Sequence, residues 1–176
     1  MEKFKTLPRK VFKKTPRQTG KSLACLALGF LALCYTGWLI PQRISLSPTP
    51  SVGHYVFLYK KHFKPSDVRK GSLVVVPLYT KLVPHCWPCL VVKYVRCESG
   101  ERLDVRNARE FYCNNVFLGR AKTRSKMGVP VKVFQYHGII PNGKFFAMGT
   151  CIDSYDSRYV GLEKKSDIKA IAVPLI

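Results

Sequence analysis

The chain has 176 residues, and 30 lysines and arginines against 10 aspartates and glutamates give it a net charge of +20. This length is enough for one folded domain with a single core, and no second domain is needed. No internal repeat or low-complexity tract is present, and the positive charge favours contact with anionic lipid headgroups or with an acidic partner.

An uncharged apolar segment, residues 22–40, follows a basic N-terminal arm, residues 1–21. At a rise of about 1.5 Å per residue, this segment makes a helix of about 28 Å, which matches the hydrocarbon core of a bilayer. Because lysines and arginines are concentrated in the arm, the positive-inside rule places the N-terminus in the cytoplasm. We therefore expect one transmembrane helix, with the rest of the chain outside the cytoplasm.

A cleaved secretory signal is the alternative interpretation of the apolar segment. Its length, and the absence of Ala-x-Ala-like small residues after it, favour an uncleaved anchor. A nucleic-acid partner is disfavoured for an exported domain, and no recognition helix or base-stacking motif is visible in the sequence.

The remainder of the chain has the pattern of a mainly β domain. Residues 41–50 are expected to form a short linker, and the domain itself is expected to span residues 51–176. Short β-branched and aromatic runs alternate with turn residues, whereas helical periodicity is scarce. Residues 108–127 are the least regular and are predicted to be an inserted loop or hairpin. The predicted strands are Tyr55–Tyr59, Leu73–Leu78, Leu90–Val95, Val131–Tyr136 and Lys169–Val173.

A candidate nucleophile lies at the start of this domain. Ser51 follows two prolines that stiffen the chain, and Gly53 lets another backbone approach closely. A serine nucleophile needs a base, and none of the four histidines lies in a setting that indicates a Ser–His–Asp relay. A lysine is the other option, provided that burial lowers the pKa of its ammonium group.

Two lysines lie within predicted apolar strands. Lys93 shares its strand face with two valines, and Lys132 lies between two others. The apolar pattern does not choose between them, and a snorkelling side chain at a strand edge is the alternative for either. Lys122 and Lys126 lie in a polar run and are expected to be solvated.

Five short motifs then occur in order along the chain: Thr49-Pro50-Ser51-Val52, Arg69-Lys70-Gly71-Ser72-Leu73-Val74-Val75-Val76, Val92-Lys93-Tyr94-Val95 with Ser99–Leu103, Ile140–Gly149, and Ser154–Gly161. Their order and spacing resemble those of the membrane-anchored Ser/Lys signal peptidases, and specifically of the conjugative-transfer branch, the TraF-like pilin-processing peptidases. The last two motifs are the most specific. They are similar to the family's Pro-x-Gly-x-Tyr-Phe-x-Met-Gly-Asp-Asn stretch and its Ser-x-Asp-Ser-Arg-Tyr-x-Gly continuation.

The resemblance implies a catalytic dyad, with Ser51 as the nucleophile and Lys93 as the general base. It also implies that Ser154 hydrogen-bonds the base lysine. Asp156 and Arg158 match a structural ion pair that supports the site in the family. A surface salt bridge is the alternative for that pair.

Thr49 matches a position where many relatives have a serine whose hydroxyl helps to form the oxyanion hole. The second donor would be the backbone N–H of Ser51. Two donors at the developing oxyanion stabilise the tetrahedral intermediate, each by about 3 kcal/mol in a water-poor cleft.

The chain also departs from the family pattern. Val52 replaces the usual methionine, Ser72 replaces an acid, and Thr150-Cys151 replaces the Asp-Asn pair. The last change alters the hydrogen bonding expected there but leaves the dyad in place. Residues 115–138 have no counterpart in the family pattern, so the lysines between Lys122 and Lys132 receive no role.

The implied function is that of a membrane-bound serine endopeptidase that cleaves exported precursor proteins after small side chains. A conjugative pilin is the expected client, and some relatives pass the acyl-enzyme to the substrate's own amine and so cyclise it. The expected location is the bacterial inner membrane, with a single pass and the catalytic domain in the periplasm. Secretion or conjugation machinery is an expected partner, and no metal or cofactor is implied.

The cysteines support two alternative functions. Five of the seven lie after the apolar segment, where an oxidising compartment predicts disulfide pairs with one cysteine left over. Cys86-Trp87-Pro88-Cys89 has the spacing of a thiol redox motif, so a membrane-tethered thiol–disulfide oxidoreductase is the rival function. Such a motif normally opens a helix, whereas a β run follows here, which favours a structural disulfide. A non-catalytic subunit of a pilus or secretion scaffold is the third possibility.

Overall fold

The computed structural model describes residues 16–47, 51–83 and 86–175. The chain divides into two units, Met1–Pro41 and Gln42–Ile176.

The first unit contains helix α1, Pro16–Arg43, which continues for two residues into the second unit. Within it, Lys21–Leu39 is apolar enough and long enough to cross a membrane, and none of this span is buried inside the protein. The span coincides closely with the predicted anchor, residues 22–40. Residues 1–15 of the predicted basic arm lie outside the described residues. An apolar helix with no protein packed around it is the arrangement expected for a helix that is covered by lipid.

The second unit is formed mainly by strands. One sheet contains β1 (Ile44–Leu46), β2 (Val56–Lys60), β3 (Leu73–Leu78), β4 (Cys89–Glu98), β9 (Lys144–Met148), β10 (Glu163–Lys164) and β11 (Ala170–Pro174). The other contains β5 (Arg102–Arg106), β6 (Glu110–Cys113), β7 (Val116–Arg120) and β8 (His137–Ile139). Three short helical turns complete the unit, namely η1 (Pro65–Asp67), α2 (Ser157–Val160) and η2 (Lys165–Asp167).

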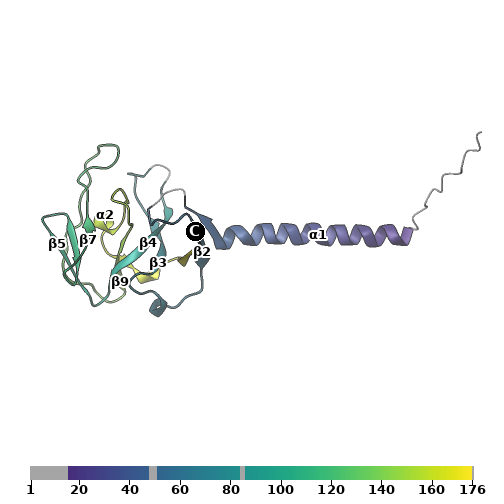
Figure 1. Ribbon diagram of the computed structural model, residues 1–176, viewed down its shortest axis with the longest axis horizontal. Coiled ribbons are helices and arrows are strands. Elements are labelled where there is room, and N and C mark those ends of the chain that lie inside the picture. The colour runs from purple at the N-terminus through teal and green to yellow at the C-terminus, as the bar shows by residue number, and fades with distance from the viewer. Residues whose placement is uncertain (1–15, 48–50, 84–85, 176) are drawn as a thin grey trace, which may run out of the picture. The chain divides into compact units, whose positions relative to one another are not determined.

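Both sheets are antiparallel throughout, which confirms the predicted mainly β fold. The larger has the strand order β1-β2-β11-β3-β4-β9-β10, and the smaller has the order β7-β6-β5-β8 (Figure 1). The C-terminal strand β11 lies between β2 and β3, so residues far apart in the sequence share the middle of the larger sheet. Strand β4 is bonded to both β3 and β9 and is therefore an interior strand.

The predicted strands compare unevenly with the observed ones. Leu73–Leu78 is observed with the predicted bounds, and the runs at Tyr55, Leu90 and Lys169 are observed with shifted ends. The predicted irregular segment, residues 108–127, contains the hairpin of β6 and β7. Part of the predicted linker forms β1, which pairs with β2 and belongs to the sheet.

The predicted strand Val131–Tyr136 is wrong. Its backbone N–H groups donate to different segments of the chain and not to one partner strand. Val131 N–H donates to Thr123 O, and Phe134 N–H donates to Arg158 O. A β-branched, alternating run is therefore extended here without a continuous partner strand.

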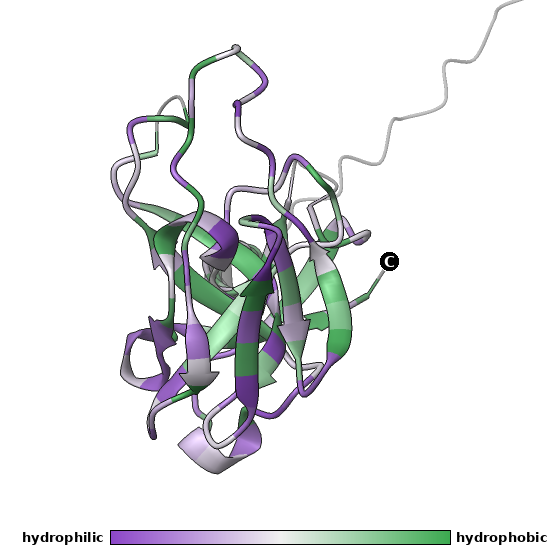
Figure 2. Ribbon diagram, turned by 90° about the vertical axis from the view of Figure 1, so that its left-hand side faces the viewer, coloured by the Kyte–Doolittle hydropathy of each residue, from purple (hydrophilic) through white to green (hydrophobic). Residues whose placement is uncertain are grey.

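The strand residues form hydrophobic clusters on both faces of the larger sheet. On β4, Val92 packs in a cluster with Val52 and Phe57, whereas Val95 packs in another with Val74. This alternation confirms that Lys93 shares its face with Val95. Figure 2 shows hydrophobic and hydrophilic residues alternating along several strands, as expected where one face is buried.

A disulfide between Cys97 of β4 and Cys113 of β6 joins the two sheets. Both cysteines are fully buried in a third cluster, which also contains Phe111 and Phe146, stacked at a ring-centroid distance of 5.1 Å. The smaller sheet is therefore held against β4 and β9 by both packing and a covalent bond.

Removing this disulfide is expected to destabilise the domain. The bond closes a loop with a sequence separation of 16, so the double change Cys97→Ala, Cys113→Ala should lower the free energy of unfolding by about 3 kcal/mol. The check is denaturant unfolding of the full-length protein in detergent. The matched control is Cys86→Ser, Cys89→Ser, whose bond has a separation of 3 and should matter less. Equal losses for the two pairs would contradict this interpretation.

Candidate active site

Lys93 is a buried lysine in an interior strand. It lies opposite Val74 in the β3–β4 pairing and is 4% exposed. Its amine donates a hydrogen bond to Ser154 Oγ at 2.6 Å. Burial lowers the pKa of Lys93 from its ordinary value of 10.5, the charge of Arg158 acts in the same direction, and Asp156 opposes both. The neutral amine, which can accept a proton, is therefore favoured here more than in a solvated lysine.

The structure separates the two lysines that the sequence pattern left equivalent. Lys132 is exposed in the irregular segment after β7, whereas Lys93 is buried in β4. Of these two lysines, only Lys93 lines a cleft of about 620 Å³ in the domain.

Ser51 lines the same cleft as Lys93 and Ser154. It begins a turn directly before Val52, whose side chain is buried in the core. The Ser51 carbonyl accepts hydrogen bonds from the backbone N–H of Thr150 at 2.8 Å and from the Thr150 hydroxyl at 3.3 Å. The loop that follows β9 thus holds the backbone of Ser51 at one wall of the cleft.

Gly149 lies in close contact with both Ser51 and Ser154. A Cβ on Gly149 would lie 2.5 Å from the carbonyl oxygen of Ser51 and would also overlap the side chain of Ser154. Ser154 Oγ in turn accepts a hydrogen bond from the Lys93 amine. Gly149 therefore lies against both the backbone of Ser51 and the side chain that contacts Lys93. Any side chain at position 149 would push these groups apart.

Asp156 and Arg158 form a buried ion pair that organises the surrounding loops. The Arg158 guanidinium contacts both carboxylate oxygens at 2.8 and 2.9 Å, and both side chains are almost fully buried. Arg158 also donates to the carbonyls of Ser154 and Cys151, while Asp156 accepts from Gly149 N–H at 2.9 Å. A forked pair with these extra partners fixes the two loops that carry Gly149 and Ser154.

Several residues at the site were not predicted from the sequence. Gly149 ends one of the sequence motifs and Thr150 follows it directly, but their contacts with Ser51 join positions about a hundred residues apart. Lys122 was predicted to be solvated, and its side chain is 43% exposed, but its pairing with Asp153 at the cleft wall was not predicted. Glu163 is half-buried, and burial together with Asp167 and Asp156 raises its pKa to about 7. Thr49, the predicted oxyanion donor, lies outside the described residues.

The Cys86–Cys89 disulfide has a setting that favours a structural role over a redox role. Cys86 and Cys89 form a disulfide at the entry to β4, and no helix begins at Cys86. Cys151 remains unpaired among the described residues and is half-buried. Cys97, Glu101 and Cys113 have possible metal-ligand atoms that lie within 4.8 Å of one another. The bond between Cys97 and Cys113 removes the two thiolates that a metal would need.

Comparison with known proteins identifies the family. The model of the family described as "Signal peptidase, peptidase S26" matches residues 18–175, so the chain belongs to this family. The chain is also similar to the crystal structure of a signal peptidase I from Enterococcus faecalis V583. That similarity has 20% sequence identity and a TM-score of 0.38, and it covers 58% of this chain and 94% of that chain. A comparison with curated proteins gives no match.

Family membership makes the protein a serine endopeptidase that cleaves precursor proteins. Members of the family are anchored in the membrane, and helix α1 supplies an apolar helix of sufficient length. The predicted signal-peptidase-like β domain with one N-terminal apolar helix is confirmed at this level.

Gly149→Ala is expected to reduce proteolysis without unfolding the domain. The added methyl group must displace Ser51 or Ser154, and a shift of about 1 Å at an active site lowers the rate about 100-fold. Peptide cleavage and circular dichroism would measure the two effects. The control is Gly37→Ala in α1, where nothing lies within 4 Å of the added atom. Full activity of Gly149→Ala would show that this close approach is unimportant.

Proposed function

We propose that Ser51 and Lys93 form a Ser/Lys catalytic dyad and that the enzyme processes an exported precursor, of which a conjugative pilin is the first candidate. The observation that carries the proposal is the position of the Lys93 amine. It is buried, its pKa is lowered, it donates to Ser154 Oγ at 2.6 Å, and it lines the cleft that Ser51 also lines. A neutral amine in this position can serve as the base that a serine nucleophile needs.

In the proposed reaction, Ser51 Oγ attacks the scissile carbonyl while its proton passes to Lys93. The lysine, now charged, gives that proton to the departing amine, and an acyl-enzyme remains on Ser51. Lys93 then takes a proton from the water that attacks the acyl carbon. It returns this proton to Ser51 Oγ as the ester bond breaks, which releases the new carboxyl group and restores the serine. Ser51 N–H and the Thr49 hydroxyl are the proposed donors to the oxyanion.

Ser154, Asp156 and Arg158 have supporting roles in this proposal. Ser154 orients the amine of Lys93 through its hydroxyl. The Asp156–Arg158 pair holds the loops on which Ser154 and Gly149 lie. These residues act through Lys93 and Ser51, so they are positioning residues.

The proposed setting is the bacterial inner membrane, with the N-terminus in the cytoplasm and the β domain in the periplasm. The concentration of basic residues before the apolar span supports this orientation. The TraF-like branch, inferred from motif order, supports a pilin client with small residues before the cut. Transfer of the acyl group to the precursor's own amine, in place of water, would give a cyclised product, and secretion machinery would deliver the substrate.

Mass spectrometry of candidate pilins provides the test of the client. Cells that carry the wild-type enzyme should contain the processed pilin, and cells that carry Ser51→Ala should accumulate the precursor. A cyclised product would be lighter than the processed linear chain by the mass of one water. Identical pilin masses in both strains would rule out a pilin client.

Replacing either dyad residue should abolish cleavage. Ser51→Ala and Lys93→Ala should each lower kcat/KM for a precursor peptide by about 10,000-fold or more, because the two groups act as a unit. Lys93→Arg should be equally inactive, since a guanidinium stays charged. Lys132→Ala is the matched control and should retain activity, as should Cys86→Ser, Cys89→Ser. The reverse pattern, with the thiols essential and the dyad dispensable, would support the oxidoreductase function.

Activity should rise with pH. Lys93 accepts a proton only when it is neutral, and its pKa lies below the ordinary value of 10.5. The rate should therefore increase as pH passes upward through the lowered pKa and should level off above it. The measurement is kcat/KM between pH 5 and about pH 10 with a fixed peptide. A profile that is flat, or that falls across this range, would contradict a lysine base.

A further inference from the structure

The cleft carries a cluster of charged residues that the proposed reaction does not use. The segment after β7, residues 121–131, is here called the basic loop. Its charged side chains at the cleft are Lys122, Arg124 and Lys126. Figure 1 shows the chain after β7 extending beyond the sheets, and the loop residues that line the cleft do so together with Ser51 and Lys93.

The basic loop is held in a defined shape. Ser125 and Val129 are joined by a backbone bond, and Arg124 donates to the carbonyl of Gly128 at 2.9 Å. At the base of the loop, Lys122 N–H donates to the Tyr159 hydroxyl, and the Tyr159 ring stacks on Tyr155 at 4.9 Å. The cationic side chains therefore extend from a fixed backbone at the cleft wall.

The charges of the basic loop are only partly neutralised. Lys122 pairs with Asp153, and Lys126 lies 3.5 Å from the other oxygen of the same carboxylate. No carboxylate of the described residues forms an ion pair with Arg124. Three cations thus face one anion, and the surplus positive charge lies beside an otherwise largely apolar cleft wall that includes Leu82 and Leu90.

We infer that the basic loop selects substrates that carry an aspartate or glutamate close to the scissile bond. The inference rests on the proposed function and names the substrate class of the same site. An acidic side chain of an extended peptide in the cleft would meet Arg124 and Lys126, the two cations that Asp153 leaves least neutralised. Charge complementarity of this kind discriminates between substrates.

The test uses full-length enzyme in a neutral detergent, so that lipid headgroups contribute no charge. A peptide library with a central small-residue segment and randomised flanking positions first locates the cut and the preferred flanking residues. A matched pair of peptides then differs only by glutamate or glutamine at the preferred acidic position. Wild-type enzyme should cleave the glutamate peptide with a kcat/KM about fivefold higher, and the ratio should shrink at high salt.

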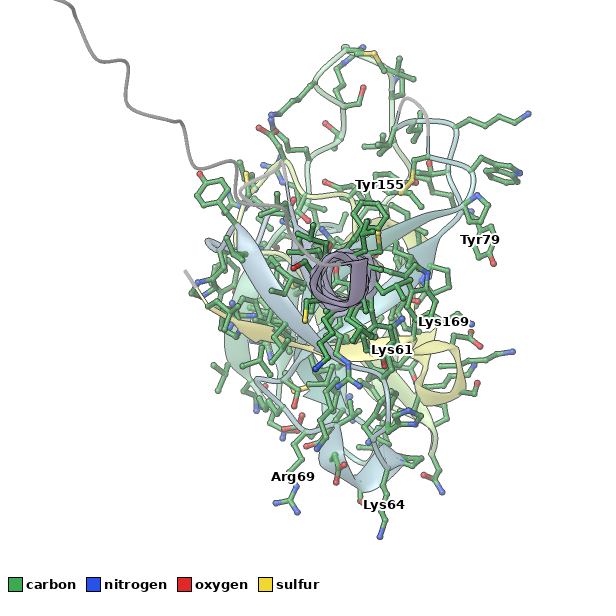
Figure 3. All side chains as sticks on the ribbon, turned by 90° about the vertical axis from the view of Figure 1, so that its right-hand side faces the viewer. Lys61, Lys64, Arg69, Tyr79, Tyr155 and Lys169 are labelled. Atoms are coloured by element: carbon green, nitrogen blue, oxygen red, sulfur yellow. A yellow bond between two sulfur atoms is a disulfide. The ribbon has the colours of Figure 1, made fainter. Side chains whose placement is uncertain are left out.

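Variants of the basic loop should change the ratio of kcat/KM for the glutamate peptide to that for the glutamine peptide. Arg124→Gln and Lys126→Gln should each lower the glutamate-to-glutamine ratio, and Lys126→Glu should invert it. Lys64→Glu is the matched control, because Lys64 is exposed and does not line the cleft. Figure 3 places Lys64 and Arg69 at the end of the domain away from Tyr155, which lines the cleft. The control should keep the wild-type ratio.

Three outcomes would overturn the inference, and they show whether the proposed function fails with it. Equal cleavage of the two peptides by the wild type, or an unchanged ratio in Lys126→Glu, would overturn the acidic preference and leave the proposed dyad intact. Cleavage of no library peptide by a folded wild-type enzyme would overturn the proposed function, and the inference with it.

Discussion

The organisation of the domain depends on an amine that is buried in the middle of a β sheet. Moving the ammonium group of Lys93 out of water is unfavourable, and the protein satisfies the side chain with a hydroxyl, Ser154, as its nearest partner. A carboxylate in that place would have favoured the charged form. A hydroxyl accepts a hydrogen bond while leaving the neutral amine accessible. The same hydroxyl that makes the lysine tolerable in the core also keeps its neutral form available, as the proposed role of Lys93 as a base requires.

The two charged side chains that act most strongly on Lys93 are Asp156 and Arg158, and they are paired with each other. Asp156 and Arg158 bond in a forked geometry, so the field of each at the amine is partly cancelled by the other. Their remaining donors and acceptors bind Gly149, Ser154 and Cys151. Breaking such a buried pair by removing one partner is strongly destabilising. The pair therefore links the stability of the loops to the position of the serine and lysine.

The local features of the sequence predicted much of the fold and part of the site. Alternation along β4 predicted that Lys93 would share a face with Val95, and the structure places Val92 and Val95 in separate clusters on the two sides of the sheet. The same kind of pattern failed at Val131–Tyr136 because strand formation also requires a partner, and that run meets only separate loops. Burial of Lys93, and exposure of Lys132, followed from sheet position and not from their neighbours in sequence.

The contacts that complete the site join distant positions, which single-sequence patterns do not reveal. Gly149 meets Ser51 across almost a hundred residues, and Lys122 meets Asp153 across a separation of 31. Motif resemblance found Ser154, Asp156 and Arg158 because they occur together in one short stretch. It found no role for the basic loop, since residues 115–138 have no counterpart in the motif pattern.

The most direct measurement is an NMR titration of the Lys93 side chain in full-length Ser51→Ala protein, with Lys93→Arg used to assign the signal. The ¹³Cε resonance of Lys93 should titrate with a midpoint below 10.5, the ordinary value. A midpoint at or above 10.5 would mean that the amine is charged at neutral pH. Such a midpoint would contradict the proposed role of Lys93 as the general base.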